Sequence, residues 1–150
     1  MKFNIINYDE SLTEQIVSMW RPSKELAFGQ EDIHSFEEDV QFIKNVLSKE
    51  NKILLATTLR SEQVLGMIAF TSETIAQLYT DIEHLNLGIG TTLLNIAKEQ
   101  STGKLELFTF QINKIGRSFY EKHGFVEVGR NYENELNLPD IKYRWEKPSI

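Results

Sequence analysis

The sequence predicts a mixed α/β fold in one domain, residues 1–150. Strand-like and helix-like segments alternate along the chain, which is the pattern of such folds. A chain of 150 residues is long enough for one domain with its own hydrophobic core. The hydrophobic share of 41% and the charged share of 25% are typical of a globular protein, and no repeat, linker or low-complexity tract divides the sequence.

The N-terminal elements are predicted from hydrophobic spacing and helix-start signals. Residues 3–8 form a short predicted strand. Ser11 with Glu14 matches a capping box, and the apolar residues that follow recur at helical spacing. Because Pro22 cannot donate a backbone hydrogen bond, we expect the helix to end there and residues 22–33 to form a loop.

A second helix and a hairpin follow. Ser35 with Glu38 matches another capping box. One apolar stripe marks the helix that begins there: Phe36, Val40, Ile43 and Leu47. Residues 52–59 and 64–71 are strand-like runs joined by a short polar segment, which predicts a β-hairpin.

The C-terminal half alternates between strands and helices. The predicted elements are a strand at 74–81, a helix at 90–101, a strand at 104–110, a helix at 114–123, and strands at 125–129 and 140–147. Gly103 and Gly124 are the expected ends of the two helices. In the last strand Ile141, Tyr143 and Trp145 alternate with charged residues, so one face of that strand is apolar.

Composition argues against several classes of function. The net charge of −6 argues against non-specific nucleic-acid binding, and it fits either a cationic ligand or simple solubility. The absence of cysteine excludes disulfides, zinc–thiolate sites and an acyl-cysteine intermediate, and the three histidines are too far apart to predict a metal site. The apolar run 53–56 is too short to span a membrane, and residues 1–7 do not resemble a signal peptide, so we expect a cytoplasmic protein without a membrane partner.

A glycine-bearing turn lies between the predicted strand 74–81 and the predicted helix 90–101. Residues 85–90 read Leu-Asn-Leu-Gly-Ile-Gly. The first N–H groups of a helix lack partners and its dipole favours negative charge, so this turn predicts a phosphate or pyrophosphate site. It is not a Walker A loop, because no lysine follows Gly90. It is not a dinucleotide fingerprint either, because Leu93 stands where the third glycine belongs.

A second block, residues 113–125, gives the turn a more specific meaning. It reads Asn113-Lys-Ile-Gly-Arg-Ser-Phe-Tyr-Glu-Lys-His-Gly-Phe125. This block resembles the N-x-x-A-x-x-F-Y-x-x-x-G-F block of the GNAT superfamily of acyl-CoA-dependent N-acyltransferases, and Gly88-Ile89-Gly90 resembles the end of the Q/R-x-x-G-x-G/A pyrophosphate signature of that superfamily. The resemblance covers about residues 53–130. Residues 134–145 and residues 34–39, at the start of the second helix, also resemble a group of uncharacterised bacterial GNAT proteins. They extend the resemblance to nearly the whole chain.

Three residues depart from the family pattern. Leu85 replaces the usual Gln or Arg, and Asn86 replaces a common Gly. The turn therefore lacks one polar side chain near the phosphates, which is expected to weaken CoA binding. Gly116 replaces alanine, which costs the helix about 1 kcal/mol.

The resemblance implies a fold and an activity. The GNAT fold is a twisted mixed sheet flanked by helices, in which strands 74–81 and 104–110 splay apart to admit the acyl-CoA arm. The implied activity is acetyl-CoA-dependent transfer of an acetyl group to a primary amine of a small molecule or peptide, with no metal. The alternative is a GNAT-fold module that binds acyl-CoA without turnover, as a sensor or as a partner of another chain. The sequence leaves open the acceptor and the oligomeric state, homodimer included.

The resemblance also assigns the cofactor residues. The expected acetyl-CoA contacts are Leu78, Tyr79, Thr80, Asn86, Leu87, Gly88, Ile89, Gly90, Thr91, Thr92, Asn113, Phe119 and Tyr120. The strand edge 78–80 would pair with the pantetheine like an added strand, and one of its N–H groups could polarise the thioester oxygen. The side chains of Thr91, Thr92 and Asn113 are equally suited to capping a helix.

Tyr120 resembles the general acid of the family. A phenol with a pKa near 10 stays protonated at neutral pH and can donate to the departing thiolate; the structural alternative is a tyrosine that packs beside Phe119. An amine acceptor also needs a base. The candidates are Glu73, which is one residue out of phase with the inward positions of its strand, and His34, which titrates near neutrality. Asp81 or a water chain is a further candidate.

Two groups of residues are candidates for the acceptor pocket. Five carboxylates near the start of the second helix either attract a small cationic amine or only favour the helix dipole: Glu31, Asp32, Glu37, Glu38 and Asp39. Residues on and just after the two splayed strands either line the acceptor site or fill the sheet: Gln77, Tyr79, Thr109, Phe110 and Gln111.

Overall fold

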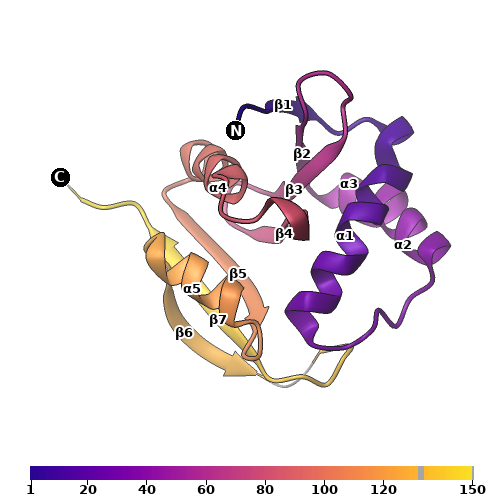
Figure 1. Ribbon diagram of the computed structural model, residues 1–150. Coiled ribbons are helices and arrows are strands. Elements are labelled where there is room, and N and C mark those ends of the chain that lie inside the picture. Colours follow the sequence, from indigo (N-terminus) through magenta and orange to yellow (C-terminus); the bar gives the residue numbers. More distant parts are fainter. Residues whose placement is uncertain (132–133, 150) are drawn as a thin grey trace.

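Two antiparallel sheets form the centre of the fold (Figure 1). The computed structural model describes residues 1–131 and 134–149. The first sheet has the order β1-β2-β3-β4, formed by Asn4–Asn7, Lys52–Thr57, Val64–Phe70 and Ile75–Thr80. The second has the order β5-β7-β6, formed by Lys104–Phe110, Asp140–Glu146 and Val126–Asn131. The antiparallel pairing of β2 with β3 confirms the predicted hairpin.

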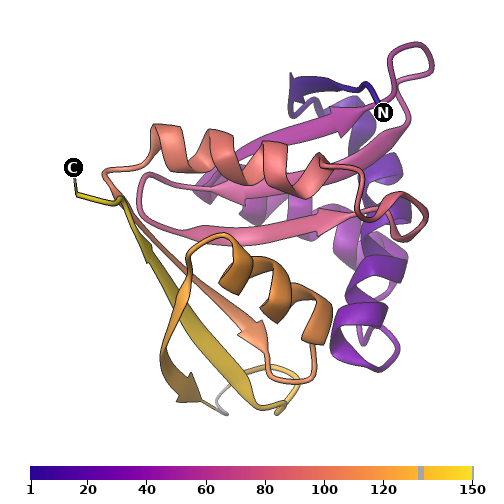
Figure 2. The same ribbon diagram turned by 60° about the vertical axis from the view of Figure 1, so that its left-hand side comes forward.

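The two sheets meet where β4 and β5 begin. Thr74 and Glu106 form a parallel bridge, and the Glu106 N–H donates to the Glu73 carbonyl at 3.0 Å. Beyond this point β4 is paired with β3 and β5 with β7, and Figure 2 shows the two strands diverging. The expectation that these strands lie side by side in parallel and then splay is confirmed.

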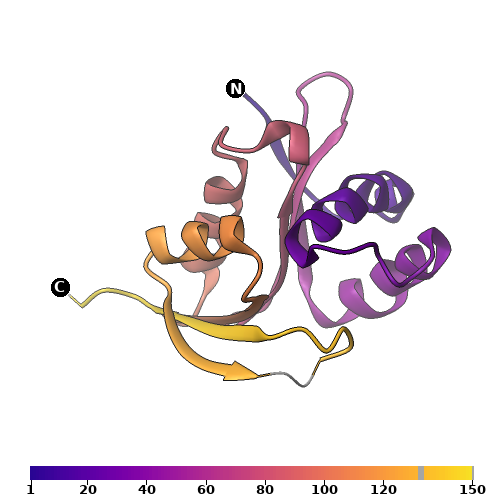
Figure 3. The ribbon, with the colours of Figure 1, turned by 60° about the horizontal axis from the view of Figure 1, so that its bottom comes forward.

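Helices cover both faces of the sheets (Figure 3). On one face lie α1 (Thr13–Phe28) and α2 (Phe36–Phe42), the latter continued by a π-helical turn (Ile43–Leu47) and by α3 (Ser48–Glu50). On the other face lie α4 (Ile89–Gln100) and α5 (Lys114–Lys122). Short 3-10 turns at Glu10–Leu12 and Ile82–His84 precede α1 and α4. The predicted mixed α/β fold class is confirmed. Within residues 1–131 and 134–149, no helix has the length and apolar character needed to cross a membrane.

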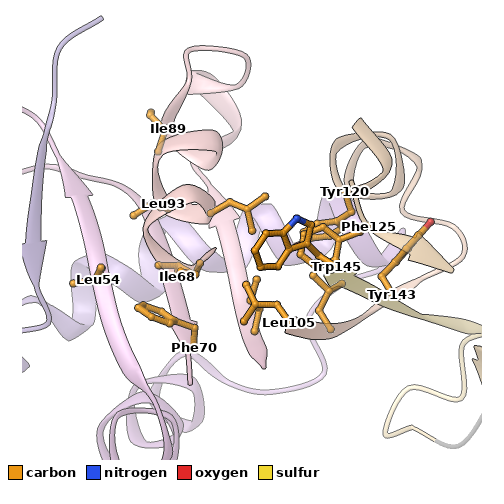
Figure 4. Close-up of a cluster of buried hydrophobic side chains, with 14 of the residues drawn as sticks. Leu54, Ile68, Phe70, Ile89, Leu93, Leu105, Tyr120, Phe125, Tyr143 and Trp145 are labelled. Carbon is orange, nitrogen blue, oxygen red and sulfur yellow. The ribbon is translucent and has the colours of Figure 1, made fainter. Parts of the chain in front are cut away.

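Each face of the first sheet has its own hydrophobic cluster. On the α4 and α5 side the cluster runs from Leu54 through Leu93 to Tyr120 and Trp145, as Figure 4 shows. On the other side, residues of α1 and α2, Trp20 among them, pack against β2 and β3. Alternation along the strands sends neighbouring side chains to opposite faces, which is why both sides of this sheet are covered.

Gly66 fixes how closely α4 approaches the sheet. A Cβ at this position in β3 would lie 2.8 Å from Cγ2 of Ile89 and 3.2 Å from the carbonyl oxygen of Tyr79. Such contacts are too short for a side chain, so glycine is required for the start of α4 to pack against β3 beside β4. The N-terminus of α4 is thereby held next to the splayed strands.

The first helix is longer than predicted, because it continues through Pro22 to Phe28. The loop expected at 22–33 is therefore wrong for its first seven residues. Proline forfeits one helical hydrogen bond, but Ser23 and Lys24 directly after it are buried, and Ser23 Oγ donates to the Thr80 carbonyl at 2.9 Å. Packing against β4 outweighs the lost bond. The helix ends at Gly29, whose φ of 71° lies in the left-handed region.

The two predicted capping boxes have different outcomes. The one at Ser35 is confirmed, because Ser35 Oγ accepts from the Glu38 N–H at 3.1 Å and Glu38 Oε1 accepts from the Ser35 N–H at 2.9 Å. The one at Ser11 is wrong. Asp9 accepts from the Ser11 N–H at 2.9 Å and caps the 3-10 turn, and α1 begins after it without a side-chain cap.

Two element ends also differ from the prediction. α4 ends at Gln100 with Ser101 as its C-cap, so Gly103 lies in the turn before β5, where its φ of 107° requires glycine. The strand expected at 125–129 corresponds to β6 and extends to Asn131. Both shifts are within the usual uncertainty of element boundaries.

Buried ion pairs hold the segment between α1 and α2. Lys24 Nζ lies 2.7 Å from Asp32 Oδ2 and 3.1 Å from Asp39 Oδ2, and Arg21 Nη1 lies 2.7 Å from Asp39 Oδ2. Lys24 and Asp39 are buried. Two of the five clustered carboxylates are thus neutralised by cations of α1, and a third, Glu38, completes the capping box. Asp32, Asp39 and Glu38 thus have structural partners: the first two hold α1 and only Glu38 serves the helix start.

Replacing Asp39 with asparagine should reduce the free energy of unfolding by about 3 kcal/mol, because it leaves Lys24 and Arg21 sharing a single carboxylate in a buried setting. Urea unfolding would measure the change. The matched control is Glu37→Gln on the exposed side of the same helix, which should change stability by less than about 0.5 kcal/mol. Equal stability of the two variants would contradict a structural role for the ion pairs.

Candidate functional site

Two adjoining cavities lie beside the splayed strand β4. The larger, of about 760 Å³, lies among the end of β4, the glycine turn, the start of α4, α5 and α1. The smaller, of about 340 Å³, lies between β4 and β5 and reaches the start of β7. Leu78, Tyr79, Asn113 and Tyr120 line both. The two cavities therefore adjoin at these four residues.

The larger cavity contains the open end of α4. Gly88 caps the helix with a φ of 87°, and its carbonyl accepts from the Thr92 N–H at 3.0 Å. The N–H groups of Ile89, Gly90 and Thr91 precede the first helical hydrogen bond, and no described side chain accepts from them. Free donors together with the positive end of the helix dipole make this end an anion site, which fits the pyrophosphate of CoA.

Most of the expected cofactor residues meet in this cavity. Those that line it are Leu78, Tyr79, Thr80, Asn86, Gly88, Ile89, Gly90, Thr91, Asn113, Phe119 and Tyr120. Leu87 and Thr92 are not among the lining residues. Leu87 is exposed, and the Thr92 hydroxyl donates to the Gly88 carbonyl at 2.9 Å, so Thr92 serves the helix end.

Helix α5 closes the cavity over the start of α4. A Cβ at Gly90 would lie 3.3 Å from the Phe119 ring, so glycine permits this close approach. His123 Nε2 lies 3.2 Å from Thr91 Oγ1 and joins the two helices. Burial, and then the charges of Lys98 and Lys122, lower the pKa of His123, so its ring is neutral at neutral pH.

The sequence reasoning missed several residues of this wall. His123, Lys114, Lys122 and Ser23 line the larger cavity but were not predicted to do so. The signal available for the lysines was their position on the helix that follows Asn113, because a phosphate ligand needs cations nearby. No comparable signal existed for Ser23, because it was expected in a loop.

Asn113 caps α5, as one of its two predicted roles requires. Its Oδ1 accepts from the Gly116 N–H at 3.0 Å, and its Nδ2 donates to Thr109 Oγ1 at 3.0 Å. A Cβ at Gly116 would lie 2.3 Å from the Asn113 amide nitrogen, so glycine leaves room for the side chain to fold back over the helix. Asn113 also lines both cavities, which keeps its pantetheine role open.

Tyr120 lies at the junction of the two cavities. Its ring is buried and packs edge-on against Phe119 and Phe125, with centroid distances of 5.4 and 5.6 Å. The described residues give its hydroxyl no hydrogen-bond partner. Burial, and then proximity to Tyr79, raises the pKa of Tyr120 above its ordinary value. The hydroxyl is therefore protonated at neutral pH and able to donate.

The structure does not bring the two candidate bases into the cleft. Glu73 is exposed just before β4, at the closed end where the two sheets meet, and it lines neither cavity. His34 also lies outside the cavities; its Nε2 is 2.8 Å from Glu135 Oε1, a hydrogen bond that raises the pKa of His34. Asp81, the further candidate, accepts from the Glu83 N–H at 2.9 Å and caps a 3-10 turn.

A comparison with protein families shows the family of this chain. A family model described as "Acetyltransferase (GNAT) domain" matches residues 23–147. The chain belongs to the GNAT acetyltransferase family. No curated protein matches it in sequence.

Solved structures share the GNAT fold of this chain. Apo-form YjaB from Escherichia coli has a TM-score of 0.80 at 19% identity and covers 99% of this chain and 100% of its own. A GNAT acetyltransferase from Staphylococcus aureus Mu50 has a TM-score of 0.76 at 22% identity, and the match covers 98% of this chain and 100% of that protein. The PaiA N-acetyltransferase from Thermoplasma acidophilum, solved in complex with coenzyme A, has a TM-score of 0.68 at 21% identity and covers 97% and 99%.

The smaller cavity of this GNAT chain contains most of the residues expected at the acceptor end. Gln77, Tyr79, Thr109 and Phe110 line it, whereas Gln111 does not. Gln111 instead joins the loop before β7, its N–H donating to the Pro139 carbonyl at 2.8 Å. None of the five clustered carboxylates near α2 lines either cavity.

The acceptor end also has two polar residues that sequence reasoning missed. Asn134 and Asp140, the latter at the start of β7, line the smaller cavity. They were missed because nothing in their spacing indicates that β7 adds to β5. Among the described residues, no three histidine, aspartate or glutamate side chains are grouped so as to hold a metal ion.

Proposed function

We propose that this protein is an acetyl-CoA-dependent N-acetyltransferase that transfers an acetyl group directly to a primary amine of a small molecule or peptide. The observation that carries the proposal is the pair of adjoining cavities. One contains the start of α4 with its free N–H groups, the other lies between β4 and β5, and a protonated tyrosine lines both.

The larger cavity fits the co-substrate. The N–H groups of residues 89–91 would bind the pyrophosphate, and the unpaired edge of β4 at Leu78–Thr80 would hydrogen-bond the pantetheine. A backbone N–H of that edge would polarise the thioester carbonyl. The shared fold of the Thermoplasma acidophilum N-acetyltransferase, solved in complex with coenzyme A, supports this arrangement.

The chemistry needs one proton donor and two proton losses. The amine nitrogen forms a bond to the thioester carbon, and the carbon–sulfur bond then breaks. One proton of the ammonium first leaves to solvent, which frees the nitrogen lone pair for attack. Tyr120 would then donate its proton to the departing thiolate and regain the second proton that the nitrogen loses. Because the chain has no cysteine, transfer through an acyl-cysteine is excluded, which favours direct attack by the amine.

An assay across a panel of amines tests the proposal. Acetyl-CoA is incubated with the protein and with aliphatic amines, arylalkylamines, polyamines or a short peptide with a free N-terminus. Free thiol and acetylated product are both measured, because thiol release alone also reports hydrolysis. We expect an N-acetylated product with at least one class. Tight CoA binding without any product would instead support the acyl-CoA-binding module.

A further inference from the structure

Asp140 is a buried carboxylate at the acceptor end of the cleft. It begins β7, between β5 and β6, where it is paired with Phe110 on one side. Its exposed fraction is 6%, and it lines the smaller cavity. Among the described residues that line this cavity, it is the only one with a charged side chain. The cavity is otherwise walled by aromatic, aliphatic, amide and hydroxyl groups.

One oxygen of this carboxylate has no partner. Oδ2 accepts from Asn134 Nδ2 at 3.3 Å, whereas Oδ1 is buried and accepts from no described residue. Buried acceptors are nearly always satisfied, because an unsatisfied one keeps the full cost of leaving water. A ligand in the cavity that donates a charge-assisted hydrogen bond to this carboxylate would balance its charge.

The nearest cations of the same strand do not serve this purpose. Arg144 Nη2 lies 2.7 Å from Glu106 Oε2, and Lys142 Nζ lies 3.6 Å from the same oxygen. Both cations are therefore paired with a different carboxylate, and neither lines the cavity. No ion pair joins Asp140 to a described cation, so its carboxylate is available to a cationic molecule that enters the cavity.

We propose that Asp140 binds the ammonium group of the acceptor, and that the smaller cavity selects small cationic amines with no acid group near the nitrogen. The inference rests on the proposed acetyl transfer and names its substrate class. Phe110, which is paired with Asp140 across the two strands, supplies an aromatic wall beside the carboxylate, which suits an arylalkylamine or a short aliphatic amine. An α-amino acid would place its own carboxylate beside Asp140 and be repelled.

Three probes of nearly the same shape test the selection. Benzylamine is a cation near neutral pH, phenylhydrazine is neutral, and phenylglycine adds a carboxylate beside the amine. Binding to the CoA-loaded protein is measured by calorimetry, and turnover with acetyl-CoA is measured in parallel. We expect the wild type to prefer benzylamine over both of the other probes.

The variant Asp140→Asn keeps the shape and an oxygen for the Asn134 contact but removes the charge. Benzylamine affinity and kcat/KM should fall by at least about 30-fold, mainly through KM, because one partner of a buried charge pair is lost. The affinity and kcat/KM for phenylhydrazine should change by less than about 3-fold. The ratio of the benzylamine affinity to the phenylglycine affinity should become smaller. Glu146→Gln removes one exposed carboxylate of the same strand and should change none of these values.

A second change keeps the inference falsifiable if Asp140→Asn perturbs the fold. Gln77 lines the same cavity from β4, so adding Gln77→Glu to Asp140→Asn returns one carboxylate to the cavity. Partial recovery of the preference for benzylamine over phenylhydrazine is expected. Unchanged benzylamine affinity in Asp140→Asn, or no benzylamine binding to the wild type, would overturn the inference. A wild-type protein that does not bind CoA, or that transfers no acetyl group to any amine, would instead overturn the proposed function.

Discussion

Replacing Gly90 with aspartate should weaken CoA binding by about 100-fold to 1000-fold. Gly90 is the second residue of α4, among the N–H groups assigned to the pyrophosphate. A unit charge about 4 Å from a phosphate charge costs about 4 kcal/mol near a protein surface, and solvent screening reduces this toward the lower figure. Calorimetry with CoA would measure the loss.

The variant Gly90→Asn separates charge from shape. A Cβ at residue 90 would lie 3.3 Å from the Phe119 ring, so both substitutions press on α5 to the same degree. An aspartate in the first turn of a helix also favours the helix dipole, so the aspartate variant should stay folded. Asparagine should therefore cost much less CoA affinity than aspartate. Equal losses in the two variants would show that packing rather than anion binding explains the effect.

The sequence predicted the fold from local signals, and the resemblance of residues 85–90 and 113–125 to the GNAT superfamily predicted many of the residues that line the larger cavity. Hydrophobic alternation marked the strands, and the glycine turn required left-handed backbone at Gly88. The block around Asn113 and Tyr120 then placed α5 over the start of α4. Residues 78–92 and 113–120 supply most of this end, whereas Ser23 of α1, which also lines it, could not be predicted from either stretch.

The sequence could not predict the parts that depend on distant contacts. α1 passes through Pro22 because Ser23 bonds to β4, and this contact is invisible in local spacing. Asp32 and Asp39 appeared free to attract a ligand until the structure showed Lys24 between them. Asp140 reaches the acceptor end only because β7 pairs with β5, a neighbour far away in the sequence.

Replacing Tyr120 with phenylalanine should lower kcat by about 100-fold to 10,000-fold, the usual effect of removing a general acid. The hydroxyl has no partner among the described residues, and the ring contacts with Phe119 and Phe125 would remain, so the fold and CoA affinity should change little. Steady-state rates and CoA calorimetry would measure both quantities. Wild-type turnover in the phenylalanine variant would exclude the role.

Two neighbouring tyrosines make the test specific to one hydroxyl. Tyr143 is also buried, but its hydroxyl donates to Glu121 at 2.6 Å outside both cavities, so Tyr143→Phe should leave kcat nearly unchanged. Tyr79 lines both cavities, so it is the rival donor; a large loss of kcat in Tyr79→Phe with none in Tyr120→Phe would reassign the role of general acid.

Burial raises the pKa of Tyr120, so its protonated, donating form persists as the pH rises. The kcat of the wild type should therefore show no fall from Tyr120 ionisation up to about pH 10, and an alkaline fall that disappears in Tyr120→Phe would contradict this burial.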